Sequence, residues 1–70
     1  SMEEMIERLK NRVSLGSECT FVDLFEEAYD RPTVIVTFLA ILEMVRLRFF
    51  RIFQQKLFGT IYVTRLDHAG

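Results

Sequence analysis

Apolar side chains recur at helical spacing at the start of the chain. They stand at positions i, i+3, i+4, i+7 and i+11, which aligns them along one stripe of an amphipathic helix. The stripe consists of Met2, Met5, Ile6, Leu9 and Val13. The other positions alternate glutamate with lysine or arginine, as a solvated face does. We expect this helix to end within residues 14–17, where Gly16 supplies the left-handed residue that closes many helices.

The next segment predicts a short strand and then a short helix. Cys19 to Phe21 form the strand, and Thr20 is the expected N-cap of the helix, with Asp23 completing a capping box. The apolar positions of this helix are Phe21, Leu24, Phe25 and Ala28. Residues 29–32 form a turn in which Asp30 caps the following helix and Pro32 occupies its first turn.

The third predicted helix, residues 32–47, is apolar on two sides. One side is the expected core stripe and consists of Val34, Phe38, Ile41, Leu42 and Val45. The opposite side consists of Thr33, Val36, Thr37, Ala40, Glu43, Met44 and Leu47. Such a helix is either buried all round or presents its second side to a partner. In so short a chain, we expect the second arrangement.

After the third helix the pattern changes to strict alternation. Residues 49–55 and 60–65 each alternate with period two, and a connection containing Gly59 joins them, so they predict a β-hairpin. The order of elements predicts an α+β fold of the winged helix-turn-helix type, with three helices, a short strand and a C-terminal hairpin wing. We expect one domain over residues 1–70, ordered over about residues 2–66 and frayed from Leu66 onward.

Composition favours a partner-binding protein. Half of the 70 residues are apolar, including seven Phe and two Tyr, and such a short chain buries little of its surface. The single cysteine, Cys19, favours a reducing compartment. The longest uncharged apolar stretch, residues 32–42, is too short for a membrane span, and acidic residues stand where a signal peptide would be basic. We therefore expect a cytoplasmic protein that does not bind membranes.

The charge pattern argues against direct DNA binding. Net charge is −1, and residues 17–48 hold three arginines against six acidic residues. The first half of the third helix offers no Arg, Lys, Asn or Gln to read base edges, and phosphate contacts need clustered basic residues. Arg51, Lys56 and Arg65 on the hairpin provide at most a weak contact. A DNA-binding transcription regulator remains the alternative function.

Candidate catalytic and metal-ligating residues are sparse. His68 lies in the terminal tail, and Cys19 has no histidine near it in sequence. The acidic residues of the short helix suit a solvated face and two caps, and no Cys/His spacing indicates zinc. We therefore predict a protein without catalytic residues, metal or cofactor.

The second side of the third helix and the outward side of the hairpin are the predicted partner-binding surface. Aromatic residues and methionine are enriched at such interfaces. The predicted surface consists of Val36, Ala40, Met44, Arg51, Phe53, Gln55 and Tyr62. Homodimerisation through the same apolar stripe is a further hypothesis.

Residues 18–63 resemble the C-terminal domain of the bacterial kleisin ScpA. The resemblance rests on the helix sequence Phe-Leu-Ala-Ile-Leu-Glu-Met at residues 38–44, on Gln54, and on Phe58-Gly59 followed by Ile61. The upstream Thr-Phe-Val of residues 20–22, Leu24-Phe25 and Arg31 also match. Met44 stands where the family commonly has leucine, and Thr60 where an acidic residue is common.

The resemblance implies a specific role. The chain would be the C-terminal fragment of a longer kleisin and would dock on the ATPase head of an SMC protein during chromosome condensation and segregation. The full protein would also bind ScpB through parts absent here. DNA would be contacted only indirectly, and the complex would associate with the nucleoid.

Overall fold

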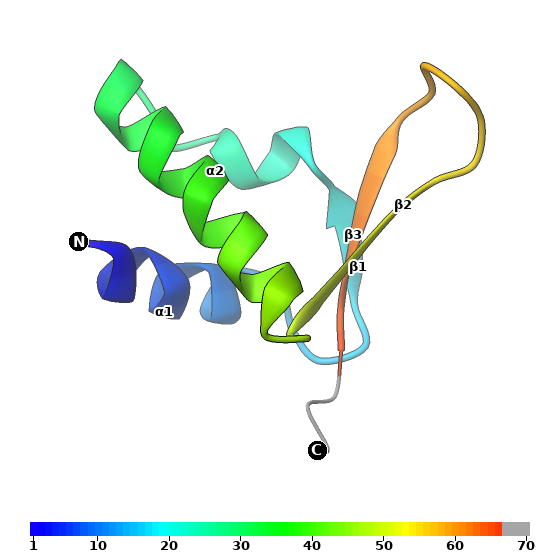
Figure 1. The fold of residues 1–70 in the computed structure, drawn as a ribbon, viewed down its shortest axis with the longest axis horizontal. Helices are drawn as coiled ribbons and strands as arrows, with labels where there is room; N and C mark the ends of the chain where they lie inside the picture. Colours follow the sequence, from blue (N-terminus) through cyan, green and yellow to red (C-terminus); the bar gives the residue numbers. More distant parts are fainter. Residues whose placement is uncertain (67–70) are drawn as a thin grey trace.

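Two α-helices pack on one side of a three-stranded antiparallel sheet (Figure 1). This is a computed structural model, and it describes residues 1–66. The elements are α1 (Met2–Arg12), β1 (Glu18–Thr20), η1 (Val22–Phe25), α2 (Arg31–Arg46), β2 (Phe50–Gln54) and β3 (Ile61–Arg65). The predicted α+β class is confirmed. The expected disorder around His68 lies outside the described residues, whereas Leu66 donates its N–H to the Phe49 carbonyl oxygen at 2.8 Å and so continues the hairpin.

The predicted middle helix is instead a single 3-10 turn, η1. The Leu24 N–H donates to the Phe21 carbonyl oxygen at 3.2 Å, and the Glu26 N–H donates to that of Asp23 at 3.3 Å, three residues apart in each case. The capping pair is as predicted: the Thr20 N–H donates to the Asp23 carboxylate at 3.1 Å, and the Asp23 N–H donates to the Thr20 hydroxyl at 3.2 Å. These reciprocal bonds fix the exit from β1, but the segment is too short for a full α-helix.

The two α-helices have side-chain caps at their N-termini, and that of α2 is the one predicted from the sequence. Ser1 and Glu4 form a capping box at the start of α1. Asp30 accepts the Thr33 N–H at 3.0 Å at the start of α2, as predicted. Gly16 has the expected positive φ of 75°, but it does not close α1, because the helix ends earlier, at Arg12, with Val13 as its extended C-cap. The two N-terminal caps depend on neighbours in sequence, whereas the Gly16 N–H donates to the Arg65 carbonyl oxygen at 2.9 Å and so depends on β3.

The sheet has the order β1-β3-β2, with the hairpin strands β2 and β3 adjacent. Ile52 lies opposite Val63, and Phe53 lies opposite Tyr62. Phe50, Ile52 and Val63 face the helices and pack in the core. Phe53 and Tyr62 therefore lie on the outer face of the sheet, where their rings stack with centroids 5.3 Å apart.

The side of α2 that packs in the core is the side that we expected to face a partner. Buried residues of this helix are Thr37, Ala40, Ile41 and Met44. They pack with the stripe of α1 and with the inner face of the sheet, and the Thr37 hydroxyl lies 3.7 Å from the sulfur of Met5. The expected core stripe is therefore wrong for Val34, Phe38 and Leu42, which are 40–45% exposed. Both sides are apolar, and the small Ala40 and Thr37 let α1 approach α2 closely, which the bulkier side would prevent.

Candidate protein-binding surface

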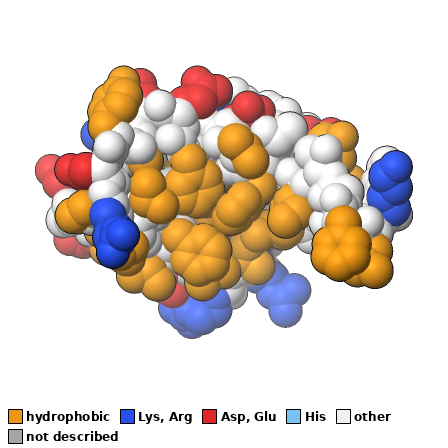
Figure 2. All heavy atoms as spheres, turned by 90° about the horizontal axis from the view of Figure 1, so that it is seen from above, with side chains coloured by type: hydrophobic (Ala, Val, Ile, Leu, Met, Phe, Trp, Pro, Cys, Tyr) orange, Lys and Arg blue, Asp and Glu red, His pale blue; other side chains and the backbone are white. Residues whose placement is uncertain are grey.

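The side of α2 that faces away from the core presents a continuous set of large apolar side chains. We call it the α2 outer face, and it consists of Val34, Ile35, Phe38, Leu39 and Leu42. Each of these residues is 40–50% exposed. Figure 2 shows the hydrophobic side chains gathered in one field across the middle of the molecule. An exposed cluster of this kind on a small chain makes the α2 outer face a candidate interaction surface.

Aromatic contacts join the α2 outer face to η1. The Phe21 ring lies edge-on to that of Phe38, with centroids 6.2 Å apart, and 5.1 Å from the ring of Phe25. Because Phe21 and Phe25 themselves pack against the core, the contact between the Phe21 and Phe38 rings helps to fix the position of Phe38. The neighbouring Val22 is 74% exposed and extends the apolar surface. The surface is therefore supported by the core and does not depend on long mobile side chains.

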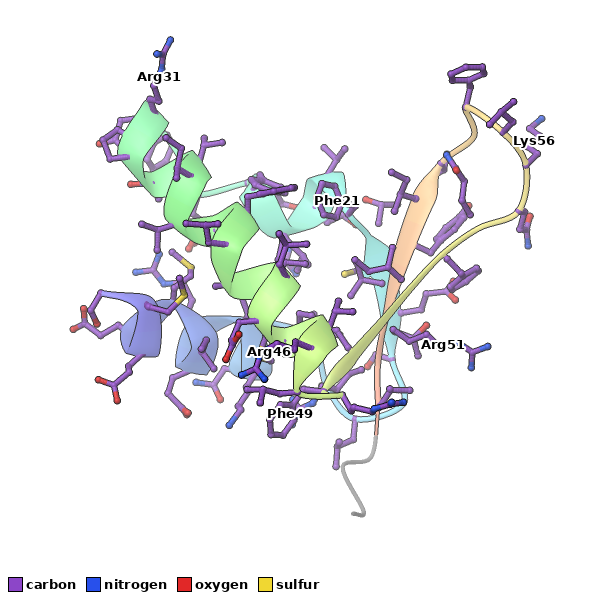
Figure 3. The ribbon with its side chains drawn as sticks, in the orientation of Figure 1. Phe21, Arg31, Arg46, Phe49, Arg51 and Lys56 are labelled. Atoms are coloured by element: carbon purple, nitrogen blue, oxygen red, sulfur yellow. The ribbon has the colours of Figure 1, made fainter. Side chains whose placement is uncertain are left out.

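Arginines stand at both ends of the helix. Arg31 begins α2 and points away from the body of the molecule, whereas Arg46 ends it (Figure 3). The Arg46 guanidinium binds both oxygens of Glu43, at 2.9 and 2.7 Å, and its hydrogen bonds lower the pKa of the Glu43 carboxyl. At helical spacing, Arg31, Ile35, Leu42 and Arg46 share one side of α2. The apolar field therefore has a charged boundary at each end.

The structure divides the seven predicted partner-binding residues into two groups. Ala40 and Met44 are completely buried, so the prediction that they form an exposed ridge is wrong. Val36 is half-buried and packs against the core. The hairpin residues Arg51, Phe53, Gln55 and Tyr62 are at least partly exposed, and their role stays a prediction.

The sequence contained a signal for the residues that were missed. Ile35 and Leu39 belonged to neither predicted stripe of the third helix, yet both belong to the α2 outer face. They follow Arg31 at steps of four, and Arg46 comes seven residues, about two helical turns, after Leu39. Because arginine side chains are almost never fully buried, the two arginines mark this side as solvent-facing.

The described residues offer no basis for a reactive thiol, a metal site or a membrane-spanning helix. Burial raises the pKa of the Cys19 thiol, and the nearby Asp23 carboxylate adds to the rise, so this thiol is a poor nucleophile. Within residues 1–66, no group of three or more Cys, Asp, Glu or His side chains is placed to hold a metal ion. Over the same range, neither helix has the length and apolar character needed to cross a membrane.

Comparison with known proteins identifies the family. The family model for Segregation and condensation protein ScpA matches residues 1–66. The chain belongs to the ScpA family. Among its relatives, Segregation and condensation protein A of Myxococcus xanthus is 40% identical over 63 residues, 87% of this chain and 22% of the relative. The corresponding proteins of Clostridium tetani and Streptococcus sanguinis are each 34% identical, over 84% and 89% of this chain.

This ScpA-family chain spans only about a quarter of the length of these relatives, 23% for Clostridium tetani and 26% for Streptococcus sanguinis. The motif that carried the resemblance closes the hairpin. The Gln54 side chain donates to the Gly59 carbonyl oxygen at 2.8 Å, and Phe58 has a φ of 62°. A Cβ at Gly59 would lie 3.0 Å from the Lys56 carbonyl oxygen, so a larger residue there would force the turn to shift. These residues define the shape of the wing-like hairpin.

Proposed function

We propose that this chain is a non-catalytic protein-binding module of winged-helix type that docks on the ATPase head of an SMC protein. The observation that carries the proposal is the α2 outer face, five large apolar side chains left exposed on a helix that is already rigid. Membership in a family named for segregation and condensation supports a role for this surface in chromosome condensation.

The physical properties of the α2 outer face suit stable docking. Protein interfaces have an apolar centre and a polar rim, and here the apolar centre lies between Arg31 and the Arg46–Glu43 pair. The helix is capped and packed before a partner arrives, so little conformational entropy is lost on binding. Phe38, braced by Phe21, is the expected anchor residue.

The hairpin residues belong to a different side of the molecule. The outer face of the sheet carries Phe53, Tyr62 and Arg51, whereas the α2 outer face is the side of α2 that faces away from the core. A single flat partner surface would not reach both. We therefore propose the α2 outer face as the main contact with the head.

In the full-length protein, the module would attach the kleisin to the SMC head. ATP would be hydrolysed by the SMC heads, ScpB would bind other parts of the kleisin, and DNA would be contacted only through the complex. The assembly would lie in the cytoplasm on the nucleoid, and the module itself would need no cofactor.

The test is co-elution of the chain with the SMC head of the same organism on gel filtration. We expect a stable one-to-one complex at micromolar concentrations. Separate elution of the two proteins at every concentration would contradict the proposal.

Two alternatives are tested with the same preparation. A DNA-binding transcription regulator would bind duplex DNA at low salt, with affinity that falls steeply as salt is added. A homodimer formed through the α2 outer face would show a concentration-dependent mass in sedimentation. We expect a monomer that does not bind duplex DNA.

A further inference from the structure

The free edge of β2 is a second surface, separate from the α2 outer face. Among residues 1–66 the strand order is β1-β3-β2, so only one side of β2 is paired. In an antiparallel pair, every second residue of a strand bonds to its neighbour, and the bond from the Leu66 N–H to the Phe49 carbonyl oxygen shows which residues do so here. Position 51 therefore bonds to β3, as position 49 does, whereas the N–H and C=O groups of Phe50, Ile52 and Gln54 point outward.

A shallow groove runs along this edge. The groove is lined by residues from both faces of β2 and from the end of α2, so it extends over both sides of the strand. The lining residues are Val45, Arg48, Phe50, Arg51, Ile52 and Leu66. Four of the six are apolar and two are arginines, so the groove has an apolar floor and a basic wall.

Charge is distributed unequally between the two parts of the chain. Residues 1–43 hold nine acidic and four basic residues, whereas residues 44–66 hold five basic residues and none that is acidic. The five are Arg46, Arg48, Arg51, Lys56 and Arg65. Arg48 and Arg51 are exposed and form no ion pair within residues 1–66. Arg51 points away from the helices, beside the hairpin (Figure 3).

We propose that the β2 edge binds an extended protein segment in which acidic and apolar residues alternate, added as a fourth strand. The outward N–H and C=O groups at Ile52 would pair with the backbone of the segment. Successive side chains of that strand point to opposite faces. Apolar residues on the inner face would meet Val45 and Ile52, and acidic residues on the outer face would meet Arg51.

Two other readings of the β2 edge make different predictions. Arg51 could serve only to keep edges of separate molecules apart, as charged residues on edge strands do, and then no peptide binds. Basic residues beside Phe53 and Tyr62 also resemble a stacking platform for single-stranded nucleic acid, which would bind without regard to peptide pattern. Outward main-chain groups and an apolar groove floor favour the protein segment.

The test is an NMR titration of the ¹⁵N-labelled chain with an acetylated, amidated octapeptide of alternating glutamate and valine. We expect the amides of Phe50, Ile52 and Gln54 to shift and to exchange more slowly with solvent. An octapeptide of alternating lysine and valine should bind at least about tenfold more weakly. No shift at millimolar peptide, equal binding of the lysine peptide, or binding of oligothymidine at the same amides would overturn the proposal.

Two variants localise the site. A synthetic chain with N-methyl-isoleucine at position 52 loses the outward N–H but keeps every bond to β3, and should bind the peptide at least about tenfold more weakly. Arg51→Glu should have a similar effect. Unchanged binding by both variants, each with a well-dispersed spectrum, would overturn the proposal.

The β2-edge proposal and the proposed SMC docking fail separately. Leu42→Glu, on the α2 outer face, should leave peptide binding unchanged. Loss of peptide binding in that variant would place the peptide on α2 and overturn the edge site. Failure of the edge site leaves co-elution with the SMC head untouched, because that rests on a different side of the molecule.

Discussion

The Arg65 guanidinium and the Lys10 carbonyl oxygen are joined by a 2.9 Å hydrogen bond between the last strand and the end of α1. The same nitrogen donates to the Val13 carbonyl oxygen at 3.2 Å. Arg65 thereby satisfies two of the carbonyl groups that a helix leaves unpaired at its C-terminus. A residue 55 positions away in sequence closes the first helix.

Arg65→Met should lower the free energy of unfolding by about 1–3 kcal/mol, because hydrogen bonds from a charged donor to partly buried carbonyl groups are lost. Urea denaturation followed by circular dichroism measures the change. Arg51→Met, at an exposed position, should change stability by no more than about 0.5 kcal/mol. Equal effects of the two substitutions would contradict the assigned role of Arg65.

The orientation of α2 is tested by two substitutions two residues apart. Ala40→Leu inserts atoms into a fully buried site and should cost about 1–3 kcal/mol of unfolding free energy. Leu42→Ala removes atoms from a side chain that is 45% exposed and should cost less than about 1 kcal/mol. Both values come from urea denaturation. A larger cost for Leu42→Ala would indicate the orientation that we first expected from the sequence.

The orientation of α2 was the least predictable part of the fold. The helix itself, its Asp30 cap and its approximate limits followed from residues close together in sequence. Which side faces inward depends on α1 and the sheet, and both sides carry enough apolar residues to do so. The packing of Ala40 and Thr37 against α1 is a property of shape, which apolar periodicity does not report.

The hairpin was predicted more completely than the helices. Its alternating pattern placed Phe53 and Tyr62 together on the outer face, and the structure shows their rings stacked. The short middle helix was overestimated, because its backbone hydrogen bonds join residues three apart and form only a 3-10 turn. Four apolar residues at helical spacing did not suffice to extend that turn into an α-helix.

Stability should fall in acid, partly through two capping carboxylates. Hydrogen bonds from the Thr20 backbone lower the pKa of Asp23, and those from Thr33, its side chain first, lower the pKa of Asp30. A carboxyl whose pKa is lower when folded stabilises the fold above its unfolded pKa of about 3.9. That contribution is lost as the pH falls through the lower folded value.

The acid effect is measured by urea denaturation at a series of pH values from 7 down to about 2. The double variant Asp23→Asn, Asp30→Asn should lose less stability between about pH 4 and pH 2 than the wild type. Asparagine also caps helices well, so stability at pH 7 should be largely retained. The same acid dependence in both proteins would contradict the assigned role of the two carboxylates.

The most direct test of the central claim is isothermal titration of the SMC ATPase head with the wild type and with Leu42→Glu. An unpaired charge at the centre of the α2 outer face should weaken binding at least about 30-fold while the chain stays folded. Gln55→Glu, on the hairpin, places the same charge outside that face and should bind like the wild type. Wild-type affinity of Leu42→Glu would contradict docking through the α2 outer face.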